Sequence, residues 1–295
     1  MSDDPAQDDT DSMSLDARIA ALLAPLGEQT AVAARRLTHP PSMSMSPAMD
    51  AADRSSQREG GRHRSRAADS VSLRAETPLP MGTLARLAVA VEMLRRVDLG
   101  QFGLDEPLLD LAPEDTADVA GEAAATRTLG AVCARMLAEE EPAATAAMAA
   151  LIELVGLGEI NETLSSLKLG ATHLAREADS AEAPVWRRVS TTSASDMLTL
   201  VGLLSGSAIP NAAWLRATLA SQARTPHVRS VLPPEAELAY LSAVRGRECH
   251  AAGWLRGPGG GGAFCVLLAG VDDPRRAHDT LVAVVRVLWM AWCAG

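Results

Sequence analysis

Lysine is almost absent from this chain: Lys168 is the only one, although lysine and arginine together number 27. An amine that can act as a base is therefore available at one position, because a guanidinium group does not release its proton in proteins. Aromatic residues make up 3% of the 295 residues, so Leu, Val and Ala must build the core. The longest apolar run near the C-terminus, residues 281–293, contains Arg286 and is too short to span a bilayer. We interpret it as a buried terminal helix.

Signs of export, of metal binding and of nucleic-acid binding are also scarce. The first residues are acidic and show neither the basic nor the apolar region of a signal peptide, so we expect a cytoplasmic protein. The formal net charge of −10 disfavours nucleic acids and anionic membranes as partners, because both attract a positive field. We expect no metal and no cofactor. Four cysteines without metal-type spacing are predicted to be free thiols in the core: Cys133, Cys249, Cys265 and Cys293.

The order of predicted elements is that of an α+β protein in which both chain ends meet on one sheet. Apolar periodicity and capping residues predict helices over residues 15–26, 82–97, 143–155 and 197–204, with Ser193 capping the last of these and Pro274 opening a C-terminal helix. Strands are predicted over residues 29–37, 71–75, 247–255 and 263–271. The glycine-rich stretch 257–262 is predicted to be the hairpin turn between the last two strands.

We divide the chain into a disordered acidic lead, residues 1–13, and one domain over residues 14–295. Within the domain, residues 39–70 are rich in Pro, Ser, Met, Gly and Arg, which predicts a mobile insertion. Its arginines could grip an acidic partner or RNA, but no aromatic residues lie among them to stack on bases, which favours a solvated loop. A helical lobe is expected over about residues 80–215.

Several stretches, in order along the chain, resemble the class A β-lactamases. Residues 78–107 resemble the segment in which a Ser-x-x-Lys tetrad opens the central helix. Residues 143–156 are similar to the helix after the Ser-Asp-Asn motif, and residues 167–176 to the lead into the omega loop. Residues 191–197 resemble the Thr-Thr start of the next helix, and residues 250–255 the strand that bears Lys-Thr-Gly. The resemblance implies a β-lactamase-like fold, with an antiparallel sheet flanked by N- and C-terminal helices plus an all-helical lobe.

The resemblance also implies a mechanism whose side chains this sequence has replaced. In that family a serine attacks the lactam carbonyl, while the tetrad lysine and a glutamate acting through water move the proton. The matching positions here are Thr83 and Arg86 for the tetrad, Glu140, Glu141 and Pro142 for Ser-Asp-Asn, Ala251, Ala252 and Gly253 for Lys-Thr-Gly, and Ala178 for the glutamate, with Glu177 one residue away. The backbone amides of Thr83 and Trp254 would remain as the oxyanion hole. Lys168 falls in none of these positions.

Two residues leave alternatives open. Arg86 at the start of a buried helix needs a partner, because an unpaired buried charge is costly. A pair with Glu140 would close the old pocket, whereas a side chain that reaches solvent would leave it open. Cys249 and His250 are neighbours on a predicted strand and point to opposite faces, so they cannot form a dyad. We interpret Cys249 as a core residue, and His250 either lines the cleft or is an incidental polar residue.

Three functions are compatible with these residues. The first is a β-lactamase-like protein without serine-hydrolase chemistry that binds a small molecule or protein partner in a remodelled cleft, with Arg86, Glu140, His250 and Trp254 as binding residues. The second is a hydrolase that acts on a β-lactam or a related amide or ester through Thr83. The third is a diverged enzyme that uses His250.

Overall fold

A computed structural model describes residues 13–38, 69–108, 128–138, 142–175, 190–205, 211–221 and 226–294 of the chain. The acidic lead therefore lies outside the described residues up to residue 12, and the predicted insertion does so over residues 39–68. Ser70, which we placed at the end of the insertion, already belongs to a strand.

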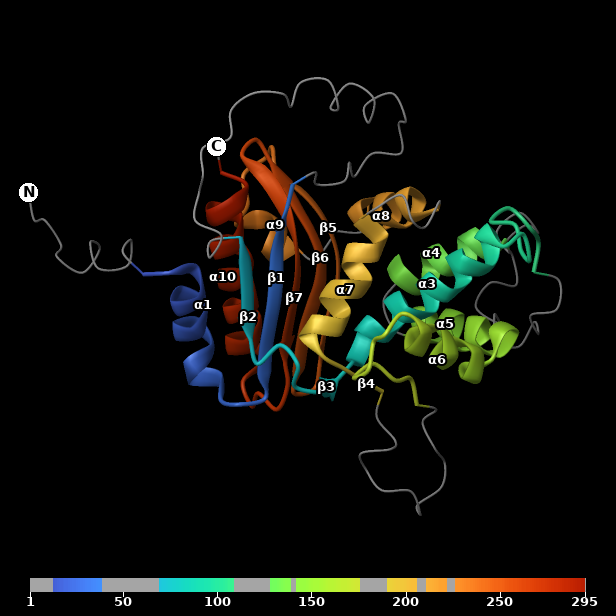
Figure 1. The fold of residues 1–295 in the computed structure, drawn as a ribbon, viewed down its shortest axis with the longest axis horizontal. Helices are drawn as coiled ribbons and strands as arrows, with labels where there is room; N and C mark the ends of the chain where they lie inside the picture. The colour runs from blue at the N-terminus through green and yellow to red at the C-terminus, as the bar shows by residue number, and fades with distance from the viewer. Residues whose placement is uncertain are drawn as a thin grey trace, which may run out of the picture.

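One five-stranded antiparallel sheet forms the centre of the molecule, with the order β2-β1-β7-β6-β5 (Figure 1). Its strands are β1 (Thr30–Leu37), β2 (Ser70–Leu73), β5 (Glu237–Arg245), β6 (Glu248–Gly257) and β7 (Gly260–Leu268). A separate two-stranded pairing joins β3 (Leu79–Pro80) to β4 (Thr191–Thr192). The predicted α+β fold with an antiparallel sheet is confirmed, but β5 at one edge is a strand that we had not placed.

The two chain ends pack together on one face of the sheet, as predicted. Helix α1 (Leu15–Leu23) continues into the 3-10 turn η1 (Ala24–Leu26). Helix α10 (Pro274–Trp292) lies beside α1, and the short α9 (Pro226–Ser230) also contacts α10 (Figure 1). Ser14 caps α1 by accepting the Ala17 N–H at 3.3 Å, and the Asp273 carboxylate caps α10 by accepting the Arg275 N–H at 3.0 Å. Between these helices and the sheet lies one of the two apolar clusters that the described residues form.

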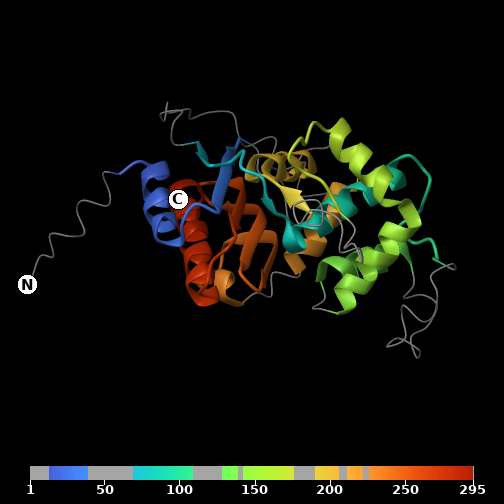
Figure 2. The ribbon, with the colours of Figure 1, turned by 90° about the horizontal axis from the view of Figure 1, so that it is seen from below.

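The opposite face of the sheet is covered by α7 (Ala194–Ser205), and α8 (Ala212–Ser221) packs against β5. Ser193 caps α7 as predicted, because its hydroxyl oxygen accepts the Asp196 N–H at 3.1 Å. The helical lobe beyond α7 and α8 holds α3 (Ala85–Asp98), α4 (Leu129–Ala138), α5 (Ala143–Val155) and α6 (Leu157–Ser166), as Figures 1 and 2 show. All ten residues from Ala85 to Leu94 are buried, so α3 is the central helix of the lobe.

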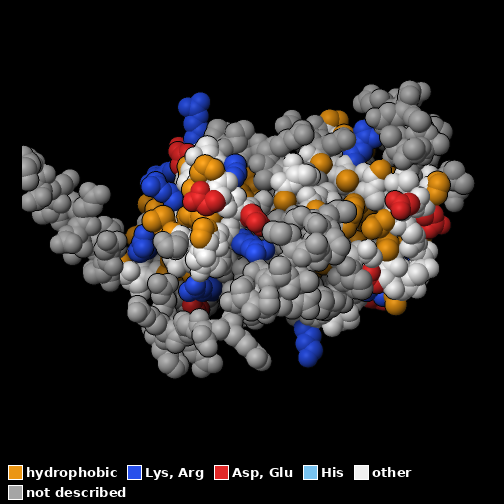
Figure 3. Space-filling model, turned by 90° about the horizontal axis from the view of Figure 1, so that it is seen from above, with side chains coloured by type: hydrophobic (Ala, Val, Ile, Leu, Met, Phe, Trp, Pro, Cys, Tyr) orange, Lys and Arg blue, Asp and Glu red, His pale blue; other side chains and the backbone are white. Residues whose placement is uncertain are grey.

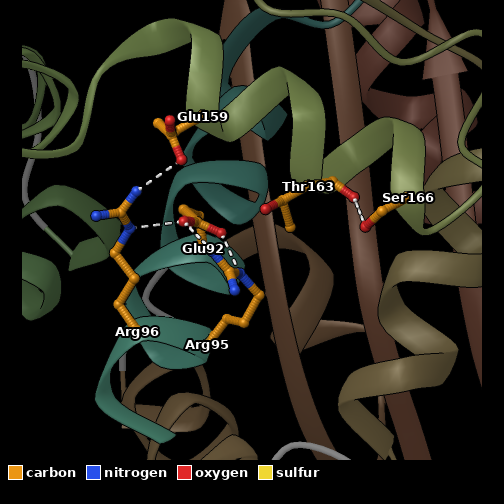
Figure 4. A network of polar contacts seen from close by, with 6 residues as sticks. All are labelled: Glu92, Arg95, Arg96, Glu159, Thr163 and Ser166. Atoms are coloured by element: carbon orange, nitrogen blue, oxygen red, sulfur yellow. Dashed lines mark hydrogen bonds and ion pairs between the residues drawn. The ribbon is translucent and has the colours of Figure 1, made fainter. Parts of the chain in front are cut away.

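A buried carboxylate links α3 to α6 inside the lobe (Figure 4). Glu92 is 0% exposed, and its oxygens accept hydrogen bonds from Arg95 at 2.7 and 2.8 Å and from Arg96 at 2.7 Å. Arg96 also reaches Glu159 on α6 at 3.2 Å. Burial alone would raise the pKa of the Glu92 carboxyl, but hydrogen bonds from Arg95, Arg96 and Thr163 outweigh burial and hold that pKa below its ordinary value.

The glycine-rich stretch has a second role besides the turn. Gly257 pairs with Gly260, so the turn itself is Pro258 and Gly259, and the following glycines belong to β7. A Cβ atom on Gly262 would lie under 3.0 Å from Trp292 of α10 and from the backbone of β1. Glycine is therefore required there because the end of α10 packs closely onto the hairpin.

Apolar side chains reach the surface at many places over the helical lobe, whereas charged side chains are more frequent over the sheet end of the face in Figure 3.

In the described ranges no single helix is long and apolar enough to cross a membrane. Helices α5 and α6 reach that length and apolar composition only as a pair, and the pair is bent by 82°.

Candidate functional site

Thr83 lies in the 3-10 turn η3 (Gly82–Leu84) that opens α3, as the tetrad resemblance predicted. The residue before this turn is held to the segment that precedes β4, because the Met81 N–H donates to the Ser190 carbonyl at 2.8 Å. Thr83 is only half-buried, and its hydroxyl forms no hydrogen bond with any residue that the structure describes. A threonine hydroxyl is a weak nucleophile until a base within hydrogen-bonding reach takes its proton.

Arg86 follows Thr83 by one helical turn and is 6% exposed. Such burial disfavours the alternative in which its guanidinium extends into solvent. Glu140, the partner that we predicted, lies outside the described residues, as do Glu141 and the omega-loop positions Glu177 and Ala178. Pro142 is described: it is exposed and stands at the N-terminus of α5.

His250 is placed directly beside the turn that carries Thr83. Its side chain is 2% exposed, and a Cβ atom on Gly82 would lie 3.2 Å from His250 Cδ2. The φ of Gly82 is +52°, a conformation that favours glycine, so the absence of a side chain there both permits the turn and makes room for the imidazole. This burial contradicts the alternative in which His250 lines an open cleft.

The hydrogen bonds of His250 decide which ring nitrogen carries the proton. Nδ1 accepts the Leu268 backbone N–H at 3.2 Å, so Nε2 must carry the proton of the neutral ring. Nε2 has no hydrogen-bond partner in the described residues, and the nearest carboxylate oxygen, Oε2 of Glu248, is 3.9 Å away. Burial lowers the pKa of His250 to about 4, against weaker opposite contributions from the backbone of Cys249 and Pro80. The imidazole is thus neutral at pH 7, but its lone pair is already occupied.

The residues that we assigned to the Lys-Thr-Gly motif lie on an inner strand. Ala251 and Ala252 are 0% exposed, and β6 is hydrogen-bonded to β5 on one side and to β7 on the other. Backbone and side chains there have no access to a ligand, so this assignment is wrong. The strand that borders η3 at the edge of the sheet is β5, and Lys168, the only lysine, is not on it.

Trp254 is likewise not a binding residue. It is 0% exposed, its indole N–H donates to the Ser205 hydroxyl of α7, and it pairs with Ala239 on β5 and Ala263 on β7. Its amide belongs to a strand that is paired on both sides, so our prediction that it completes an oxyanion hole is wrong. Trp254 instead fastens α7 to the sheet.

Sequence reasoning missed the polar groups that hold residues 171–174 in place. Asn161 on α6 donates to the Leu174 carbonyl at 2.9 Å and accepts the Leu174 N–H at 2.8 Å. The Asp196 carboxylate accepts the Ala171 N–H at 2.8 Å and the Thr172 hydroxyl at 2.9 Å. The first acidic residue of α7 was visible in the sequence, but its long-range partners were not.

The four cysteines are free and buried, as predicted. Burial raises the pKa of Cys249 to about 12, and raises those of Cys133 and Cys293 to about 12 as well. A thiol is a good nucleophile only as the thiolate, so none of these three is a reactive cysteine at neutral pH.

The sequence matches the Beta-lactamase enzyme family over residues 62–292, and the chain belongs to that family. Among solved structures it is similar to an ancestral class A β-lactamase, with a TM-score of 0.71 and 21% identity over 95% of this chain and 100% of that chain. It is also similar to β-lactamases from Chitinophaga pinensis (TM-score 0.69, 17% identity, 94% and 98% coverage) and Sphaerobacter thermophilus (TM-score 0.68, 15% identity, 94% and 96% coverage). No curated protein sequence matched. The predicted resemblance is confirmed, and at these identities the structural likeness concerns the fold alone.

Proposed function

We propose that this chain is a member of the β-lactamase family that does not carry out acyl transfer and acts by binding a small molecule or a protein partner. The observation that supports this most directly is the surroundings of the Thr83 hydroxyl. Among the described residues, the side chain one helical turn after Thr83 is the permanently charged Arg86. The neutral His250 uses the lone pair of its Nδ1 to accept a backbone N–H.

The magnitude of this deficit is large. Removing the catalytic side chains of a triad hydrolase costs about 10⁶-fold in kcat and leaves the contribution of the oxyanion hole and of substrate binding. Because no described residue accepts a hydrogen bond from the Thr83 hydroxyl, we expect a comparable deficit here. The edge strand β5 also has no lysine to dock a substrate carboxylate.

A second candidate is a hydrolase that acts on a β-lactam or a related amide or ester through Thr83. It is favoured by one observation, namely that Thr83 is not fully buried and stands at the N-terminal end of the central helix. Helix N-termini stabilise negative charge, which suits an oxyanion. A diverged enzyme that uses His250 is a weaker candidate, because the imidazole is 2% exposed.

Turnover measurements separate the first two candidates. Purified protein is incubated with a chromogenic cephalosporin beside the Thr83→Ala variant and an active class A β-lactamase. We expect the wild-type rate to equal that of Thr83→Ala and to lie about 10⁶-fold or more below the active enzyme. A wild-type rate clearly above that of Thr83→Ala would support the hydrolase and refute our proposal.

A further inference from the structure

A cavity of about 550 Å³ that is broadly open to solvent lies on the α10 side of the sheet, at residues distant in sequence from Thr83. The loop after α9 forms one wall with Leu232 and Pro233, and α10 forms another with Trp289 and Met290. Met290 is 57% exposed, and Val231 at the same cavity is 37% exposed. Both are large apolar side chains that are exposed to solvent. Ligand sites of small molecules have volumes of roughly 300–1,000 Å³, so this cavity is large enough for one.

The walls are held in place by hydrogen bonds. Arg229 donates to the carbonyls of Pro233, Pro234 and Ala236, at 3.3, 2.8 and 2.7 Å. On the other side, the Gly259 N–H donates to the Cys293 carbonyl at 2.9 Å and fixes the β6–β7 hairpin to the end of α10. A cavity with fixed walls loses little entropy when a ligand enters, which favours binding.

Two opposite charges face this cavity without partners. Arg286 on α10 and Glu235 in the loop both line it and are exposed, and neither forms a hydrogen bond or ion pair with a described residue. A ligand that is only anionic would meet the carboxylate of Glu235, and one that is only cationic would meet the guanidinium of Arg286. A ligand with one charge of each sign complements both.

We propose that this cavity binds a small apolar zwitterion, that is, an amino acid or short peptide with a large apolar side chain. Its carboxylate pairs with Arg286, which offers a planar fork of N–H donors to such a group. Its ammonium pairs with Glu235, and its apolar side chain packs between Pro233, Trp289 and Met290. Binding at this site does not depend on whether Thr83 is catalytic.

The test uses four probes on the full chain, with isothermal titration for affinity and saturation-transfer NMR for weak binding. L-phenylalanine and L-phenylalanyl-L-phenylalanine carry both charges, 3-phenylpropionate lacks the ammonium, and 2-phenylethylamine lacks the carboxylate. We expect at least one zwitterion to bind with a Kd of about 1 mM or tighter, and both single-charge analogues to bind tenfold or more weakly.

Variants then locate the site. Arg286→Gln should weaken zwitterion binding about tenfold, and Glu235→Gln should weaken it while leaving 3-phenylpropionate unaffected or tighter. Arg275→Gln, at an exposed position in the first turn of α10, is the charge-matched control and should change nothing. Absence of saturable binding of both zwitterions, stronger binding of a single-charge analogue, or affinities unaltered by both cavity variants would each overturn the proposal.

Discussion

Replacing Glu92 by glutamine tests how the helical lobe that carries Thr83 is held together. The substitution keeps the shape of the side chain and removes its charge, so it weakens three hydrogen bonds of 2.7–2.8 Å from Arg95 and Arg96. Breaking a buried ion pair costs about 3–5 kcal/mol. The Arg95 side chain is 41% exposed and that of Arg96 is 16% exposed, so both recover some hydration. We therefore expect a loss of about 2–3 kcal/mol in the free energy of unfolding, below the range for a fully buried pair.

The matched control is Glu159→Gln, which removes the outer carboxylate of the same network. Its side chain is 56% exposed and makes one contact of 3.2 Å with Arg96, and exposed ion pairs contribute roughly 0–1 kcal/mol. Urea denaturation of both variants and the wild type at pH 7 measures the difference. If Glu92→Gln costs no more than Glu159→Gln, the buried carboxylate does not hold α3 and α6 together.

The difference in stability between the wild type and Glu92→Gln depends on pH. Because the pKa of Glu92 is lower in the folded protein than in the unfolded chain, its contribution is complete above the unfolded pKa of about 4.3 and is lost as pH falls through the folded pKa. The stability gap between wild type and Glu92→Gln should therefore be constant above about pH 5 and should narrow below pH 4. A gap that widens on acidification contradicts the lowered pKa.

Other outcomes follow from packing and buried polar groups. Gly262→Ala should destabilise the protein by roughly 2 kcal/mol or more through overpacking, whereas Gly158→Ala, in α6 with open space around it, should stabilise it by about 0.5–1 kcal/mol; thermal unfolding checks both. Burial of neutral His250 lowers its pKa from 6.5 to about 4, so this residue should make the protein less stable, by up to about 3 kcal/mol in total, as pH falls from about 6.5 to 4. Nitrogen-15 NMR should find its proton on Nε2 and no titration between pH 6 and 8. Ser205→Ala should cost about 1–3 kcal/mol in urea denaturation, because it leaves the Trp254 indole N–H unpaired.

Five helices were predictable because their signals are local, whereas α4, α6, α8 and α9 were not placed from the sequence. The apolar spacing of α1, α3, α5, α7 and α10 and the capping residues of α7 and α10 lie within single segments, and α5 begins and ends at the predicted residues. Strand β5 was not found because both its faces are buried: Ala239 and Leu241 belong to the cluster on the lobe side, and Leu238 and Tyr240 to the other. Its sequence therefore shows no alternation of polar and apolar residues. Gly246, with a φ of +57° in the turn before β6, was the usable signal.

In the candidate site, too, the sequence predicted what depends on local spacing and missed what depends on contacts between distant segments. Thr83 and Arg86 lie one turn apart at the start of α3, as predicted, because a helix fixes the spacing between them. Residues 251–254 were assigned to the site because their sequence does not reveal which strand forms the edge of the sheet; that depends on pairing between distant segments. The contact of His250 with Gly82 is also long-range, as is the hydrogen bond from Leu268 that selects its tautomer.

The central claim concerns the reactivity of one oxygen atom, and intact-mass spectrometry tests it directly. The protein is held with excess benzylpenicillin for hours, quenched in acid and weighed beside Thr83→Ala. We predict an unmodified mass for both proteins at every time point. An added mass of one penicillin on the wild type, absent from Thr83→Ala, would show that Thr83 is acylated and would contradict our account of this site.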